Sequence, residues 1–223
     1  MANQDVVLYW SGGKDCATAL YDLRTEARYQ GYQVSGLLTT LTDSYDRISG
    51  HGVRNSVLDR QAHCLGLSVH KTYIPPDASM DQYDCVIESA LLEHRARGTK
   101  VAATGDIFVE KRRMSTIKSL GLRACCPLLR KQSIEHFKRI VSLGFQAYVV
   151  CVDATILDES FVGCLVDDAL LNRLPPRVDP CGENGEYHTF VCNGPMFREP
   201  VPVRRGEVVC RAGFWFCDLV VDC

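Results

Sequence analysis

The spacing of apolar residues follows two alternating periods along the first two thirds of the chain. Short β-rich runs at 5–10, 33–42, 68–75, 100–107 and 146–153 predict strands. Between them, apolar residues at helical spacing predict helices over 16–27, 52–66, 80–98, 108–121 and 133–144, the last with Ser133 as its N-cap. Because strands and helices alternate from residue 5 to about 153, the pattern predicts βαβ units and a parallel sheet with both faces covered.

The pattern changes after Asp153. Prolines and glycines break the chain into loops, and residues 207–222 alternate apolar and polar positions as a hairpin does. We therefore expect a doubly wound α/β fold followed by a smaller C-terminal α+β region. The expected division falls between 1–128 and 129–223.

Composition narrows the classes of function. The chain has 223 residues and a net charge of −2. This charge does not indicate a strongly basic surface, so nucleic acid is not an expected partner. No apolar run approaches the roughly 20 residues that span a bilayer. An acidic residue precedes the first apolar run and no basic leader is present, so we expect a cytoplasmic protein with no membrane association.

Twelve cysteines are scattered along the chain, and none forms a CxxC pair. Structural zinc sites usually draw on such pairs, so a zinc site is not expected. We interpret most of these cysteines as small buried apolar residues with reduced thiols.

The loop "SGGKDC" ends the first strand and begins the first helix. Free N–H groups at a helix N-terminus attract anions, and glycines allow phosphate to approach the backbone. Lys14 can neutralise phosphate, and Asp15 suits Mg²⁺ bridging carboxylate and phosphate oxygens. The loop matches neither the Walker nor the dinucleotide fingerprint. The alternative is an ordinary turn in which Ser11 caps the helix.

A second group of polar residues follows the strand at 100–107. Gly105 and Asp106 should lie at the same sheet edge as the loop, and Asp106 can bind a hydroxyl, an ammonium or Mg²⁺. Glu110 and Arg113 are three residues apart on the next helix and can face the same site. Alternatively, Asp106 caps that helix and Glu110 pairs with Arg113 in solvent.

A third group lies in "CGENGEYHTF", where Glu183, Glu186 and His188 stand within six residues. Acidic and imidazole groups so close together suit general acid–base chemistry or the orientation of an ammonium. The alternative is a β-turn with exposed charges. His51, in "SGHG", either touches nucleotide or substrate or is a solvated loop histidine.

These residues resemble a known family. "SGGKD" is similar to the PP-loop of the N-type ATP pyrophosphatases, and "ATGDIF" with "DPCGENGEYHTFVCNGPMF" resembles their diphthine–ammonia ligase-like branch. The resemblance implies an adenine-nucleotide-hydrolase-type domain over 1–128 and a substrate region over 129–223. It also implies a ligase that uses ATP and Mg²⁺, adenylates a carboxylate, releases pyrophosphate, and lets ammonia displace AMP.

The resemblance also assigns roles to residues. It implies ATP binding by Ser11, Gly12, Gly13, Lys14, Asp15, Cys16 and Gly105. It implies catalysis by Lys14, Asp15, Asp106, Glu183 and Glu186, metal binding by Asp15, and substrate contacts by Glu110, Arg113 and His188. Cys16 stands where the family usually has serine. "Asp-Ile-Phe" stands where diphthine ligases carry Asp-Tyr-Gln, which leaves the acceptor open.

The expected partners are ATP, ammonia or ammonium, and a carboxylate-bearing acceptor that can be a protein, with a homodimer left open. Two other functions remain. One is tRNA thiolation through a persulfide cysteine on the same fold. The other is a non-catalytic ATP-binding module.

Overall fold

The computed structural model describes residues 3–108 and 111–222, which form two compact units. The first unit contains the chain up to Ser11, Asp15–Asp46 and Leu67–Arg130. The second contains Gly12–Lys14, Arg47–Gly66 and the chain from Lys131 onward. The glycine loop therefore contributes residues to both units.

The first unit is built on a parallel sheet. Its strands, in the order β4-β2-β1-β5-β6, are Val69–Ile74, Tyr32–Thr42, Gln4–Tyr9, Val101–Ala103 and Arg123–Cys125. Each adjacent pair in that order is parallel. The carboxyl ends of β1 and β5 therefore share one sheet edge, which is where parallel sheets bind ligands.

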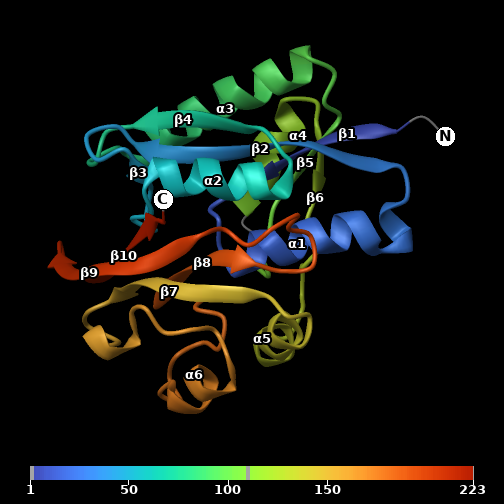
Figure 1. The fold of residues 1–223 in the computed structure, drawn as a ribbon. Coiled ribbons are helices and arrows are strands. Elements are labelled where there is room, and N and C mark those ends of the chain that lie inside the picture. The colour runs from blue at the N-terminus through green and yellow to red at the C-terminus, as the bar shows by residue number, and fades with distance from the viewer. Residues whose placement is uncertain (1–2, 109–110, 223) are drawn as a thin grey trace. The chain divides into compact units, whose positions relative to one another are not determined.

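Helices lie on both faces of this sheet. They are α1 (Lys14–Thr25), α3 (Met80–Ala96) and α4 (Lys111–Ser119), with a 3₁₀ turn η1 (Ala27–Tyr29) after α1. Side chains of α3 and α4 share a buried cluster with Val7, Leu38 and Ala102 of the strands. Figure 1 shows α1 on the opposite side of the sheet from α3. The predicted doubly wound α/β fold is confirmed.

The second unit is built on an antiparallel sheet in the order β8-β7-β10-β9. These strands are Tyr187–Asn193, Gln146–Asp153, Phe214–Val221 and Val203–Arg211. The unit also holds β3 (Arg47–Ile48), α2 (Asn55–Leu65), α5 (Ser133–Ser142), η2 (Glu159–Phe161) and α6 (Asp168–Arg173). Figure 1 shows α2 on one face of the sheet and α5 and α6 on the other.

Strand β8 presents different residues to these two faces, because side chains alternate along a strand. Cys192 packs with Cys64 of α2, so His188 and Phe190 share the face covered by α2. Tyr187 and Thr189 point to the opposite face. His188 therefore lies on the opposite face of the sheet from its neighbours Tyr187 and Thr189.

Several sequence predictions can be compared directly with these elements. The C-terminal hairpin is confirmed as β9 and β10. The strand at 146–153 is present as β7, but its expected place in the parallel sheet is wrong because β7 pairs antiparallel with β8 and β10. Ser133 does not cap α5: the N-cap is Gln132, and the Ser133 hydroxyl donates to Asp179 at 2.6 Å.

The observed division of the chain is discontinuous. Its main break, between Arg130 and Lys131, lies near the expected one after residue 128, but 12–14 and 47–66 group with the second unit. Among the described residues, no helix is long and apolar enough to cross a membrane.

Candidate functional site

Within the first unit, the glycine loop and the end of β5 are in close contact. A β-carbon at Gly105 would lie 2.7 Å from the main-chain nitrogen of Cys16, so only glycine fits there without displacing the loop. Ser11 Oγ lies 3.8 Å from Cys16 Sγ across the turn. Ser11 and Asp15 are half-buried, whereas Cys16 is buried.

Asp106 and Arg113 form an ion pair beside this edge. Arg113 Nη1 donates to Asp106 Oδ2 at 2.5 Å, and both side chains are partly exposed. The same guanidinium lies 5.4 Å from the ring centre of Tyr9, at the end of β1. Burial raises the pKa of Tyr9, so its hydroxyl stays protonated. Glu110, the expected partner of Arg113, lies outside the described residues.

Within the second unit, Lys14 is held by the C-terminal region. Its side chain is 2% exposed, and its Nζ donates to the main-chain oxygen of Cys181 at 2.5 Å. Nζ also lies 5.3 Å from the ring centre of Tyr187, and the Lys14 main-chain N–H donates to Thr189 Oγ1 at 3.0 Å. The first residue of α1 is therefore bonded to the segment that carries the acidic loop.

Gly12 joins the edge of strand β8. Its carbonyl accepts hydrogen bonds from the Val191 N–H at 2.8 Å and from Gln61 Nε2 at 3.0 Å. Its φ of 79° and a predicted clash between an added β-carbon and the Phe190 ring, at 2.9 Å, restrict this position to glycine. Gln61 is fully buried and also donates to the Val191 carbonyl at 2.7 Å.

The carboxylate of Glu186 organises the acidic loop. It accepts hydrogen bonds from the Asp179 N–H, the Asn184 N–H and the Asn184 side-chain amide, each at 2.9 Å. Burial acts to raise the pKa of Glu186, but these donors outweigh burial and lower it. A carboxylate so satisfied is a poor proton acceptor, so the geometry favours a positioning role over the expected base.

Asp179 is the second organising carboxylate. Its Oδ1 accepts from the Ser133 hydroxyl, the Cys181 N–H at 2.8 Å and the Glu183 N–H at 3.3 Å. These bonds fix the backbone on both sides of Gly182. Glu183 is half-buried in this loop, and its catalytic role stays a prediction.

His188 lies against His51. Their ring centres are 4.4 Å apart with an angle of 35° between the ring planes. His51 Nδ1 lies 3.3 Å from the Ser49 carbonyl oxygen. Both rings are half-buried, so His51 is not merely a solvated loop residue.

Most of the chain is similar to known proteins. Residues 132–220 match the family model "Diphthamide synthase C-terminal domain". The diphthine–ammonia ligase of Homo sapiens is 28% identical over 89% of this chain and 82% of its own length. That of Schizosaccharomyces pombe is 25% identical over 80% of this chain, which spans 32% of the yeast protein. The resemblance to the diphthine–ammonia ligase-like branch is confirmed.

One solved structure, of a predicted subunit of tRNA methyltransferase from Methanocaldococcus jannaschii, aligns with a TM-score of 0.46 at 18% identity. It covers 84% of this chain and 96% of that one.

Two buried cysteines of the second unit, Cys151 and Cys192, are poorly suited to act as nucleophiles. Cys151 and Cys181 are buried, and burial raises the pKa of Cys151 to about 12. Burial likewise raises the pKa of Cys192 to about 11. Thiols with such values are not nucleophiles at neutral pH.

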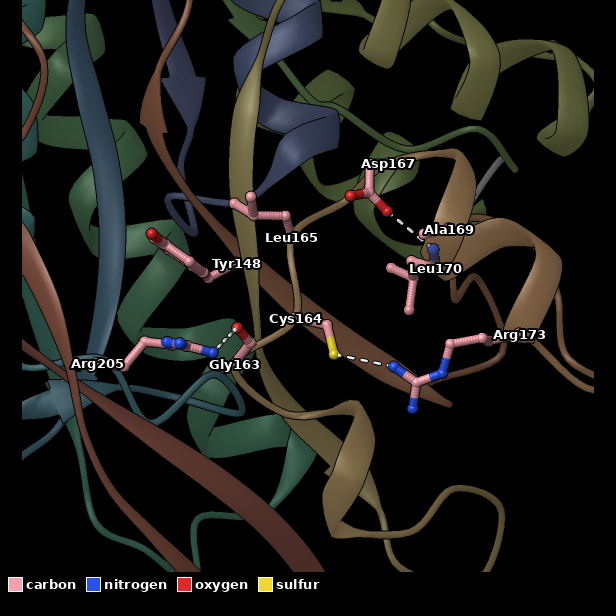
Figure 2. Close-up of a pocket in the computed structure, with 9 residues that line it drawn as sticks. All are labelled: Tyr148, Gly163, Cys164, Leu165, Asp167, Ala169, Leu170, Arg173 and Arg205. Atoms are coloured by element: carbon pink, nitrogen blue, oxygen red, sulfur yellow. Dashed lines mark hydrogen bonds between the residues drawn. The ribbon is translucent and has the colours of Figure 1, made fainter.

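The second unit also contains a cavity of about 300 Å³ away from the predicted residues (Figure 2). Arg173 and Arg205 reach its wall, where Arg173 donates to Cys164 Sγ at 3.3 Å and Arg205 donates to the Gly163 carbonyl at 3.2 Å. None of the sequence-predicted site residues lines it.

Sequence reasoning missed three residues that organise the site. Gln61, Asp179 and Asn184 bond the glycine loop or the acidic loop, yet none stood out by motif. A glutamine among the apolar positions of a helix was the available signal for Gln61, since a buried amide needs partners. Asp179 and Asn184 looked like ordinary turn residues.

Proposed function

We propose that this protein is an ATP-dependent ligase that adenylates a carboxylate and then forms an amide with ammonia, releasing AMP and pyrophosphate. One observation carries the proposal. Gly12 and Lys14 of the phosphate-binding candidate are hydrogen-bonded to Val191 and Thr189, within the segment that matches the diphthamide synthase domain. The nucleotide motif and the family motif thus form one bonded structure.

The loop fits a nucleotide substrate in most respects. Gly105 leaves no β-carbon against the Cys16 backbone, and Gly12 adopts a conformation that L side chains rarely take. Ser11 and Asp15 reach solvent, where a hydroxyl and a carboxylate suit phosphate and Mg²⁺ respectively. Lys14 fits less directly, because its amine is already bonded to the Cys181 carbonyl. We therefore assign Lys14 two tasks, charge compensation and fixing the acidic loop.

The acceptor is a carboxylate, and diphthine is the first candidate because the similar ligases bear that name. Asp106 and Arg113 offer a carboxylate and a guanidinium side by side, a combination that recognises zwitterionic or carboxylate-bearing groups. Glu183, half-buried in the same loop, is the candidate that steers or deprotonates the ammonium.

Product analysis tests this proposal. ATP labelled at the α-phosphate would be incubated with Mg²⁺, ammonium chloride and either a diphthine-containing peptide or a panel of amino acids and dicarboxylic acids. AMP formed only with one carboxylate supports the ligase. ADP, or AMP formed at the same rate without any carboxylate, contradicts it.

A persulfide-dependent tRNA thiolation has less support. That reaction needs a thiolate nucleophile, and Cys151 is buried with a strongly raised pKa. Sulfur transfer to tRNA in an assay supplied with tRNA and a persulfide donor, dependent on Cys151 or Cys181, would overturn this preference.

A further inference from the structure

The cavity of the second unit lies where strand β7 changes its neighbour. Over 151–153, β7 pairs with β10, but nearer the start of β7 the segment 163–166 takes that place. The Gly163 N–H donates to the Val149 carbonyl at 2.7 Å, and the Val149 N–H donates to the Cys164 carbonyl at 2.9 Å. One wall of the cavity is therefore a strand-like segment whose backbone is fixed by hydrogen bonds.

Two arginines approach this wall from opposite sides. Arg205 of β9 donates to the Gly163 carbonyl at 3.2 Å, and Arg173, at the end of α6, donates to Cys164 Sγ at 3.3 Å. Figure 2 shows the two guanidinium groups pointing toward each other across these two residues. Both arginines line the cavity, so two positive charges border the same space.

Contacts with the turn before this segment hold both guanidinium groups in place. Arg173 Nη2 donates to the Ser160 carbonyl at 3.3 Å and to its hydroxyl at 3.0 Å, and Cζ lies 4.7 Å from the ring centre of Phe161. Gly163 has a φ of 78°, and a β-carbon there would lie 3.1 Å from Cδ of Arg205. Glycine therefore lets Arg205 lie close to the backbone. Donors fixed in this way lose less conformational entropy when a ligand binds.

The acidic residues near the cavity are engaged elsewhere. Asp158, whose charge acts on Arg173, is the N-cap of η2, and Asp167 of the cavity wall is the N-cap of α6. Each accepts a hydrogen bond from a main-chain N–H, at 2.9 and 2.8 Å respectively. In the part of the chain that the structure describes, no carboxylate forms an ion pair with Arg173 or Arg205. Because a guanidinium has five N–H donors, each arginine keeps donors for a ligand.

The size and lining of the cavity suit a small organic anion. Its volume of about 300 Å³ is at the lower end of the range for ligand pockets, and Leu165 and Leu170 supply an apolar side. Guanidinium groups pair with carboxylate and phosphate groups through two parallel hydrogen bonds. We propose that this cavity binds a small anion whose carboxylate or phosphate group lies between Arg173 and Arg205. The site goes beyond the proposed ligase function and does not depend on it.

NMR titration of the full-length ¹⁵N-labelled protein tests the site. The probes are inorganic phosphate, succinate and glutarate, added at constant ionic strength. At least one probe should shift the main-chain signals of Gly163 and Cys164 until they saturate, and the tightest probe distinguishes a phosphate ligand from a carboxylate ligand. No saturable shift with any of the three would overturn the proposal. Shifts confined to the glycine loop would also overturn it, because the anion would then bind elsewhere.

Substitutions of the arginines test which charges hold the anion. Arg173→Gln and Arg205→Gln should each weaken binding about tenfold or more, because each removes a charged hydrogen-bond donor. Arg204→Gln is the matched control: Arg204 is the neighbour of Arg205 on β9, but it pairs with Asp222 and does not line the cavity. Its affinity should match wild type. Equal losses in Arg204→Gln and Arg205→Gln would indicate a general effect of surface charge and would overturn the site.

Asp167→Asn separates ligand binding from a purely structural role of the arginines. Asparagine still caps α6, but the negative charge in the cavity wall is gone, so anion affinity should rise. Thermal unfolding without a probe checks that each variant folds. A saturating probe should raise the melting temperature of the wild type more than that of Arg205→Gln. Unchanged or weaker binding in Asp167→Asn, or an equal rise in Arg205→Gln, would show that the arginines only stabilise the turn.

Discussion

The amine of Lys14 lies 2.5 Å from the main-chain oxygen of Cys181. A residue from the start of the first helix is thus bonded to a loop 167 residues further along the chain. The bond joins the glycine motif to the segment that carries the C-terminal acidic motif, so Lys14 is a structural link as well as a positive charge.

Replacing Lys14 should therefore affect both ATP and the fold. Lys14→Met keeps the aliphatic length beside Tyr187 but removes the donor. A hydrogen bond to a charged group contributes about 1.5–3 kcal/mol, so we expect ATP affinity to fall at least about tenfold and the melting temperature to drop. Calorimetry measures the ATP affinity, and thermal unfolding measures the melting temperature. Lys138→Met, at an exposed site of α5, is the control. ATP affinity equal to wild type would remove Lys14 from the binding site.

Glu186 should matter mainly for stability. In Glu186→Gln a single amide oxygen faces three N–H donors, so we expect a loss of roughly 1.5–3 kcal/mol in the free energy of unfolding. Because the folded pKa is lowered, this contribution is fully present above the unfolded value of about 4.3 and is lost as pH falls through the folded pKa. Urea unfolding from pH 7 to pH 3 measures it. Glu159→Gln is the exposed control. A stable Glu186→Gln that lacks only amide formation would restore the base assignment.

Glu183 should behave differently from Glu186. Glu183→Gln keeps the shape of a half-buried side chain and removes only its charge. If Glu183 steers or deprotonates ammonium, amide formation should fall about 10²–10⁴-fold more than pyrophosphate release, with little loss of stability. Single-turnover assays that follow pyrophosphate and the amide separately measure the two rates. If the two steps decline together, the loop binds the acceptor and not the nitrogen.

The Asp106–Arg113 pair should affect turnover, and α4 offers a matched control. Asp106→Asn weakens a 2.5 Å ion pair beside the glycine loop, so we expect a lower rate of AMP formation. Arg112, the neighbour of Arg113, bonds the exposed Asp81 and also Asp84. Arg112→Ala should therefore leave AMP formation near wild type. Similar losses in the two variants would mean that Asp106 acts only through the stability of α4.

The thiols should be dispensable for adenylation. Cys151→Ser and Cys181→Ser should keep most of the ATP–pyrophosphate exchange, because both thiols are buried and Cys151 is protonated at neutral pH. Exchange assays with folded variants provide the measurement. Complete loss in either folded variant would favour sulfur transfer.

The sequence predicted the first unit well because its signals are local. Apolar runs predicted the strands of the parallel sheet as far along the chain as β5, and regular apolar spacing predicted the helices between them. The adjacent glycines identified the loop. Strand β6 was missed because only Arg123–Cys125 form it. Strand β7 was placed in the wrong sheet because its apolar run fits a buried strand of either kind, and pairing depends on residues far away in the chain.

The site was predictable in its charged residues but not in their tasks. Glu186 looks like a base in the sequence, yet three N–H donors from a turn it stabilises occupy its carboxylate. The contact of His51 with His188 spans 137 positions, and Arg47 and Arg54 on either side of His51 both bond Asp218. No local pattern in the sequence encodes these contacts.

We propose that the free energy of ATP cleavage is used to join ammonia to a carboxylate. The most direct measurement is the ratio of AMP to ¹⁵N-labelled amide formed from ¹⁵N-ammonium in one reaction mixture, followed by mass spectrometry. We expect one amide for each AMP, with both products absent when ammonium or the carboxylate is omitted. AMP without labelled amide, or ADP as the nucleotide product, would contradict it.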